Sequence, residues 1–208
     1  MPSWLPAIEA NRQSLHYKKG ELLFKEGEDV KGMFFIHTGL VKVHKRWDED
    51  KELILRVAGN GDIVGHRGIG ADTIYPVSGT ALEATEVCFI SLDFFNDTLK
   101  VNHEFLYQLM MFFAAELKES EKRMRNLAHM TVKGRIASAI LTLKKKFGAT
   151  DGDLNIILSR QDFASYVGAT YETVFRVTNE LIEEKAISMD GKQITILSDG
   201  LLLDCIKD

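Results

Sequence analysis

Two charged side chains one helical turn apart, Glu172 and Arg176, stand near the C-terminal end of the chain. They follow Thr170, a residue type that favours helix N-caps, and the apolar residues around them recur on the opposite side of the expected helix. Such an outward acid–base pair is often a surface salt bridge worth about 0.2–0.5 kcal/mol. At the start of a helix lying in the DNA major groove, however, Arg donates two hydrogen bonds to guanine and Glu accepts one from cytosine.

The residues around this pair predict a winged helix. Ser159 and Asp162 form a capping box, so a first helix begins directly after Ser159. Gly168 can supply the left-handed backbone of a short turn before the second helix. Downstream, Asp190-Gly191 between alternating apolar residues is a hairpin signal. Two helices, a tight turn and a β-hairpin together make a winged helix–turn–helix.

The side chains expected to contact DNA gather at the start of the second helix and beside it. The candidates for reading bases are Tyr171, Glu172, Phe175 and Arg176, and the candidates for holding phosphates are Arg160, Thr170, Thr173 and Lys192. Residues 131–208 carry ten Lys and Arg against eleven Asp and Glu, so this positive charge must be locally arranged. Few phosphate contacts imply modest affinity per chain, which a homodimer reading two half-sites of double-stranded DNA would compensate.

The first half of the chain has a different pattern. Between residues 15 and 100, short β-branched and aromatic runs are separated by glycines, which predicts an all-β sandwich or barrel. These runs are 21–27, 33–39, 40–47, 52–59, 62–65 and 86–92.

A long helix is expected over about 102–128, where apolar residues recur at alternating spacings of four and three. We expect one face of this helix on the β domain and another on a partner helix. The residues of this dimer helix are Leu106, Met110, Phe113, Leu117, Met124 and Leu127. Thr131 is a candidate N-cap for a further helix to about Lys146. The predicted domains are therefore 1–128 and 129–208.

Composition excludes several classes of protein. The chain has 208 residues, 45% of them hydrophobic, and a net charge of −4. The apolar stretch 105–117 is too short and too interrupted for a membrane span, and the N-terminus lacks a secretory signal, so a cytoplasmic location is expected. With two cysteines, neither a disulfide scaffold nor a four-cysteine iron–sulfur cluster is expected. No phosphate-binding loop and no nucleophile elbow occurs, so we expect no enzyme.

Several segments resemble the cyclic-AMP receptor protein/FNR family of bacterial transcription regulators. The strongest similarities lie in 126–143 and 159–188, with the wing pattern at 191–196 and the glycine-punctuated β framework. The resemblance implies an α+β chain: a double-stranded β-helix (jelly-roll) of the cyclic-nucleotide-binding type, a long dimerisation helix, and a C-terminal winged helix–turn–helix.

The resemblance also implies a function and roles for individual residues. The family acts as homodimers on two-fold symmetric operators, with RNA polymerase as a further partner for activators. Glu172 and Arg176 fall on the family's base-reading Glu and Arg. Phe175 replaces a commonly small residue, and Tyr171 stands where relatives vary.

The expected effector pocket departs from the family's cyclic-nucleotide cassette of Gly-Glu followed by Arg-Ser-Ala. Gly65 matches, but His66 replaces the Glu, and Tyr75 begins the segment that stands for Arg-Ser-Ala. Arg67 is one position away and is a possible phosphate partner. This departure favours a regulator gated by an unidentified effector, or by none, over one gated by cyclic AMP.

Two alternatives involve metals. Haem ligation would use one of the histidines at 37, 44, 66 or 103. A cupin-like metal-dependent protein would need a close His-x-His spacing, which 37–44 does not supply. We therefore expect no metal site.

Overall fold

The structure, a computed structural model, describes residues 4–48, 51–150, 153–154 and 158–207. It divides into two compact units, Met1–Glu116 and Leu117–Asp208. This division lies within the long helix, whereas the proposed domain boundary after residue 128 lies near that helix's end. Among the described residues, no helix is long and apolar enough to cross a lipid bilayer.

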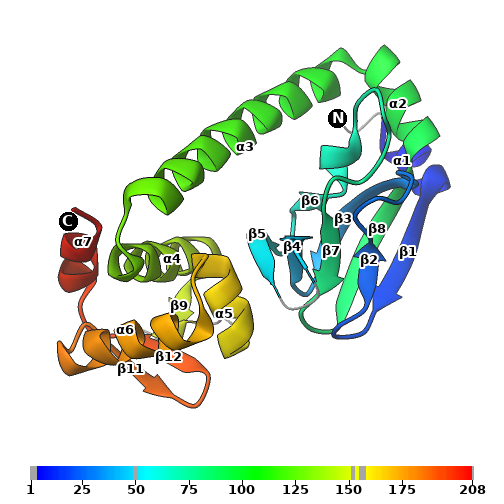
Figure 1. Ribbon diagram of the computed structural model, residues 1–208. Coiled ribbons are helices and arrows are strands. Elements are labelled where there is room, and N and C mark those ends of the chain that lie inside the picture. Colours follow the sequence, from blue (N-terminus) through cyan, green and yellow to red (C-terminus); the bar gives the residue numbers. More distant parts are fainter. Residues whose placement is uncertain (1–3, 49–50, 151–152, 155–157, 208) are drawn as a thin grey trace. The chain divides into compact units, whose positions relative to one another are not determined.

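The first unit is a double-stranded β-helix built from two antiparallel sheets (Figure 1). One sheet has the strand order β1-β8-β3-β6 and the other β2-β7-β4-β5. The strands are β1 (Arg12–Tyr17), β2 (Leu22–Phe24), β3 (Gly32–Thr38), β4 (Val41–Arg46), β5 (Glu52–Ala58), β6 (Ile63–Val64), β7 (Ser78–Ala81) and β8 (Thr85–Ser91). Both sheets contribute buried side chains to one core, among them Met33, Phe34, Val41, Val43, Val64 and Val87. The jelly-roll predicted from the sequence is confirmed.

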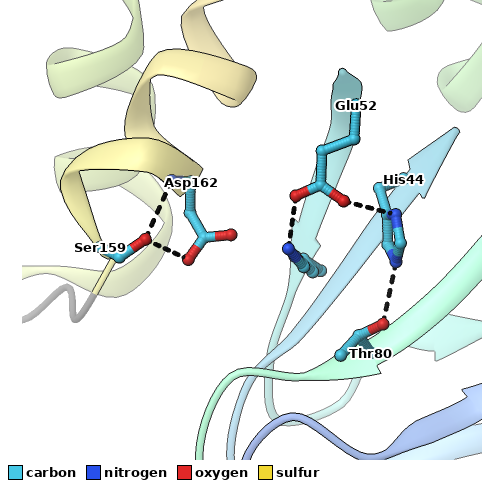
Figure 2. A network of polar contacts seen from close by, with 6 residues as sticks. His44, Glu52, Thr80, Ser159 and Asp162 are labelled. Carbon is cyan, nitrogen blue, oxygen red and sulfur yellow. Dashed lines mark hydrogen bonds and ion pairs between the residues drawn. The ribbon is translucent and has the colours of Figure 1, made fainter. Parts of the chain in front are cut away.

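A buried polar network joins the strands of the second sheet. His44 on β4 places Nδ1 2.9 Å from Glu52 Oε2 and Nε2 2.8 Å from Thr80 Oγ1 (Figure 2). Lys42 Nζ lies 2.5 Å from the other Glu52 oxygen. An ionised carboxylate can only accept a hydrogen bond, whereas the Thr80 hydroxyl can donate one or accept one, so the tautomer of His44 decides the roles of its two nitrogens. Both nitrogens of His44 are therefore engaged within the sheet.

Two helices of the first unit were not expected from the sequence. They are α1 (Leu5–Asn11) and α2 (Leu92–Val101). Helix α2 begins where the Ser91 side chain accepts a hydrogen bond from Phe94 N, and it buries Phe95 in the β core. Its start overlaps the expected strand 86–92, because Ser91 both ends β8 and caps the helix.

The long helix α3 (His103–His129) runs close to its expected range. Its early turns pack Phe105, Leu109, Phe112 and Phe113 against the β core. Phe113 thus differs from the rest of the predicted dimer stripe, because its ring contacts the jelly-roll of the same chain. Four other stripe residues are exposed in the single chain: Leu106, Met110, Leu117 and Met124.

The second unit is a winged helix. Its elements are α4 (Val132–Phe147), β9 (Ala149–Thr150), β10 (Asp153–Leu154), α5 (Arg160–Val167), α6 (Tyr171–Glu183), β11 (Ile187–Asp190), β12 (Gln193–Ile196) and α7 (Asp199–Lys207). Thr131 caps α4 as predicted, accepting a hydrogen bond from Gly134 N. The sheet order β11-β12-β10-β9 adds the hairpin to two short strands.

Three details of this unit differ from or extend the sequence prediction. From the sequence, residues 148–153 are expected to form a loop and residues 154–158 a strand. Strand β9 lies within the expected loop, and residues 155–157 lie outside the described residues. Helix α7 was missed. It packs on α4 with Leu202 fully buried, so it completes the core of the unit.

Candidate DNA-reading helix and effector pocket

The helix–turn–helix begins and turns at the residues the sequence indicated. Ser159 Oγ accepts from Asp162 N at 3.0 Å and lies 2.5 Å from a carboxylate oxygen of Asp162 (Figure 2). Gly168 ends α5 at φ 74° and ψ 45°, in the left-handed region. Thr170 then caps α6 by accepting from Thr173 N at 3.3 Å.

Two arginines that no motif in the sequence singles out hold this turn. Arg123, near the end of α3, donates from Nη2 to the backbone oxygen of Tyr166 at 2.6 Å and stacks over that ring at 4.8 Å. Arg135 on α4 donates from Nη1 to the backbone oxygen of Gly168 at 2.7 Å. These carbonyls at the end of α5 lack helical partners, so the arginines satisfy them. No spacing signal in the sequence marks an arginine that bonds to distant backbone.

The start of α6 presents the predicted base-reading side chains to solvent. Phe175 is 48% exposed and the Arg176 side chain 67%, and the ring of Tyr171 stacks on Phe175 at 6.2 Å between centroids. Arg176 is paired with Glu180 at 2.5 Å. The expected partner Glu172 lies one turn earlier on the helix and is exposed.

The predicted phosphate-holding residues surround the start of α6 from three elements. Arg160, the first residue of α5, lies 5.9 Å from the Phe175 ring and donates to the backbone oxygen of Gly191 at 3.4 Å. Lys192 follows in the wing and is exposed. The hydroxyls of Thr170 and Thr173 lie 3.0 Å apart at the helix N-terminus. Arg160 is therefore positioned between the reading helix and the wing.

In the first unit, the predicted effector residues lie close together, and Gly65 and Tyr75 are next to Gly32 of β3. Gly65 has φ 87° and precedes the 3-10 turn η2 (His66–Gly68). Tyr75 is only 2% exposed, and its hydroxyl donates to Gly32 O at 2.9 Å. Its ring lies 4.6 Å from that of Phe24. Tyr75 therefore fills volume in the core of the jelly-roll.

His66 is enclosed by helix α3. It is 3% exposed, and its ring meets those of Phe112 and Phe113 edge-on at 4.9 and 5.6 Å. Its Nε2 lies 3.8 Å from Glu116 Oε2, beyond hydrogen-bond length. Burial lowers the pKa of His66 below its usual value, so the ring is neutral at neutral pH.

Arg56 and Glu116 also lie beside His66, and neither was predicted from the sequence to belong to this site. Arg56 on β5 lies 2.8 Å from Asp62 and 3.2 Å from Glu116 of α3. Arg67 reaches the other oxygen of Glu116 at 3.2 Å. Burial alone would raise the pKa of Glu116, but His66 and the two guanidinium groups outweigh burial and hold it at about 2. Glu116 lies at the close of the apolar stretch 105–117, where no spacing signal marks it as the partner of two arginines.

Each of the two units matches a known protein family. Residues 14–102 match the family described as "Cyclic nucleotide-binding domain", and residues 134–204 match the "Crp-like helix-turn-helix domain". The chain is 31% identical over 183 residues to the "Transcriptional activator protein anr" of Pseudomonas aeruginosa, covering 86% of this chain and 75% of the relative. It is 29% identical over 192 residues to the "Anaerobic regulatory protein" of Bacillus subtilis, covering 90% and 81%.

Solved structures share the fold. FixK2 from Bradyrhizobium japonicum superposes with a TM-score of 0.85 at 22% identity, covering 93% of this chain and 96% of that chain. A putative transcriptional regulator of the crp/fnr family from Eubacterium rectale gives 0.80 at 18% identity, covering 100% and 95%. Because a relative over 30% identical aligns along most of both chains, this chain belongs to the CRP/FNR family, whose members are transcription regulators and not enzymes.

Proposed function

We propose that this regulator acts as a homodimer on a two-fold symmetric DNA operator and needs no cyclic AMP to do so. The observation that carries the DNA half of the proposal is the exposed start of α6, where Arg176 and Glu172 project beside an aromatic pair. The N-terminal part of the second helix of such a motif enters the major groove.

Each exposed residue has a proposed role in reading the operator. Arg176 leaves Glu180 and donates two hydrogen bonds to guanine O6 and N7, and Glu172 accepts from cytosine N4. The edges of Phe175 and Tyr171 can meet thymine methyl groups. Arg160, Lys192 and the capped start of α6 hold phosphates on either side.

The dimer is proposed to form along α3. Leu106, Met110, Leu117 and Met124 are between 44% and 60% exposed in the single chain. Exposed apolar residues at this spacing are typical of a helix seam between subunits. A dimer also places two reading helices about one turn of DNA apart, roughly 34 Å.

The pocket residues support the effector half of the proposal. Tyr75 and His66 are packed into the core rather than lining a polar surface. A cyclic phosphate buried beside them would lack the cassette's arginine, which is costly. A cyclic-AMP-gated regulator is the second candidate, favoured by the matched domain family. Since relatives are named activators, contact with RNA polymerase is part of the proposal.

Selection from a random DNA library by the purified protein, with no ligand added, tests the proposal. Recovery of a palindromic site with half-sites one helical turn apart is the expected result. Selection that succeeds only after cyclic AMP is added would replace the proposal with the second candidate. A folded protein that selects no DNA under either condition would contradict DNA reading by α6.

A further inference from the structure

The most distinctive charged cluster of the first unit joins the jelly-roll to α3. Arg56 on β5 and Arg67 on η2 meet Glu116 at 3.2 Å each, one arginine on each carboxylate oxygen. The side chains of Arg56, Arg67 and Glu116 are 12%, 30% and 21% exposed. Because these side chains are partly buried, salt screens their ion pairs less than it screens ion pairs on the surface.

The positive charge that faces Glu116 comes from the two arginines, while His66 lies 3.8 Å from the same carboxylate. His66 is neutral because burial lowers its pKa, and its ring stands edge-on to Phe112 and Phe113. Arg56 also bonds to Asp62 at 2.8 Å, so Arg67 depends on Glu116 for its counter-charge in this cluster. Two guanidinium groups converging on one carboxylate have the form of an anion site.

We infer that Arg56 and Arg67 form an anion site in the jelly-roll whose occupant is the chain's own Glu116. This inference rests on the proposed function and specifies its regulation. An anionic effector would fix the helix to the β-roll by bringing negative charge to this place; Glu116 brings that charge from within α3. The first half of α3, up to Glu116, is therefore held on the β-roll without an external ligand.

The aromatic residues of α3 make this attachment specific. Phe112 and Phe113 lie one turn before Glu116 and enclose His66, and the guanidinium of Arg56 lies 5.8 Å from the Phe112 ring. An anion that displaced Glu116 would have to separate these rings as well. External anions therefore compete poorly with the tethered carboxylate, whose effective concentration is high.

Substitution of Glu116 tests the inference through DNA affinity, measured by fluorescence anisotropy on the selected operator without ligand. Glu116→Gln and Arg67→Gln should each weaken binding at least tenfold, because both disconnect α3 from η2. Glu121→Gln, which removes the same charge from an exposed position of α3, should leave affinity unchanged. Circular dichroism and sedimentation establish that each variant is a folded dimer, and Arg67→Gln serves if Glu116→Gln does not fold.

Chemical rescue tests occupancy of the anion site directly. In Glu116→Ala, sodium acetate should restore DNA affinity several-fold relative to sodium chloride at equal ionic strength, because acetate supplies the missing carboxylate. The wild type and Glu121→Ala should not respond. Constant ionic strength is needed because salt alone weakens DNA binding.

The outcomes separate this inference from the proposed function. Equal ligand-free binding by the wild type and Glu116→Gln, or equal effects of acetate and chloride on Glu116→Ala, would overturn the inference and leave DNA reading intact. A wild type that binds DNA only with added cyclic AMP would overturn the inference and favour the second candidate. A wild type that binds no DNA in any condition would overturn the proposed function.

Discussion

At the scale of single residues, neighbours decide which buried groups carry charge. Glu52 and Glu116 are both held ionised, with pKa values of about 2, by basic partners that outweigh the cost of burial. His66, in contrast, is neutral at neutral pH, because burial among aromatic rings lowers its pKa. On the reading helix, exposed Arg176 is paired with Glu180 only across a solvent-exposed i, i+4 contact. That pair is weak enough for DNA to replace it.

Replacing Arg176 with Ala should remove the preference for one base pair in each half-site. Loss of a bidentate contact to guanine costs about 1–3 kcal/mol on the preferred base and little on the others. The measurement is a comparison of affinities for the operator and its single-base variants. Lys192→Ala is the matched control, because losing a phosphate contact should weaken all sequences alike. A uniform loss for Arg176→Ala would make it a phosphate contact instead.

Glu52→Gln should destabilise the jelly-roll in a pH-dependent manner. The hydrogen bond with His44, opposed by burial and aided by Lys42, lowers the pKa of Glu52 from 4.5 to about 2. Its stabilisation is therefore present above pH 4.5 and is lost as pH falls towards 2. The variant should lose about 2 kcal/mol of unfolding free energy at pH 7 and clearly less at pH 3.5.

Urea unfolding followed by tryptophan fluorescence measures this effect, because Trp4 and Trp47 both lie in the first unit. Thr80→Val removes the hydroxyl that bonds to His44 without removing a charge. This control should lose about 1 kcal/mol at both pH values. If the loss of unfolding free energy in Glu52→Gln were equally large at pH 3.5, the partners of Glu52 would not be lowering its pKa.

At the scale of elements, the turn between α5 and α6 is built from backbone geometry and distant donors. Gly168 takes φ 74°, where a side chain is strained, and Arg123 and Arg135 bond to the carbonyls around it. The orientation of the reading helix therefore depends on residues of α3 and α4 as well as on its own caps.

Gly168→Ala should destabilise the helix–turn–helix by about 1 kcal/mol, because a left-handed backbone disfavours a Cβ atom. Hydrogen exchange of the α5 and α6 amides measures the local change, and DNA affinity should fall with it. Gly200→Ala is the control: it lies in α7, where a Cβ would meet nothing closer than 3.8 Å. That variant should be stabilised by up to about 1 kcal/mol. Equal behaviour of the two would contradict a conformational role for Gly168.

At the scale of the whole molecule, the exposed apolar stripe of α3 is the surface through which two chains are proposed to associate. Leu117 and Met124 are each 60% exposed in the single chain. The winged-helix unit has nearly balanced charge, so a monomer has little general attraction for DNA. In the proposed function, regulation therefore depends on association as much as on α6.

Leu117→Glu should dissociate the dimer. A charge placed in an apolar seam costs about 3 kcal/mol or more, which weakens association roughly 100-fold. Sedimentation velocity over a concentration series measures this, and operator affinity should fall in parallel. Lys118→Glu introduces the same carboxylate at the next, exposed position and should leave the dimer intact. A dimeric Leu117→Glu protein would show that the seam lies elsewhere.

The local elements of this protein could be derived from its sequence. Capping residues Ser159, Thr131 and Thr170, the turn glycine at 168 and the alternation of strands are short-range signals, and the structure confirms each of them. The family was identified from a resemblance in residues 126–143 and 159–188, together with the order of these elements. Helix α7 was missed because it is short and its consecutive leucines at 201–203 show no helical spacing, and its stability comes from packing on α4.

Contacts between distant residues were decided only by the tertiary structure. Nothing in the spacing of Arg56, Arg67 and Glu116 brings them together; strand β5, turn η2 and helix α3 meet because their apolar neighbours share one core. The same holds for Arg123 and Arg135 at the turn. The sequence determines which groups can bond locally, since caps and turns involve residues three or four apart. Burial and long-range pairing depend on the folded core. They determine which buried side chains are ionised and which carboxylate occupies the proposed anion site.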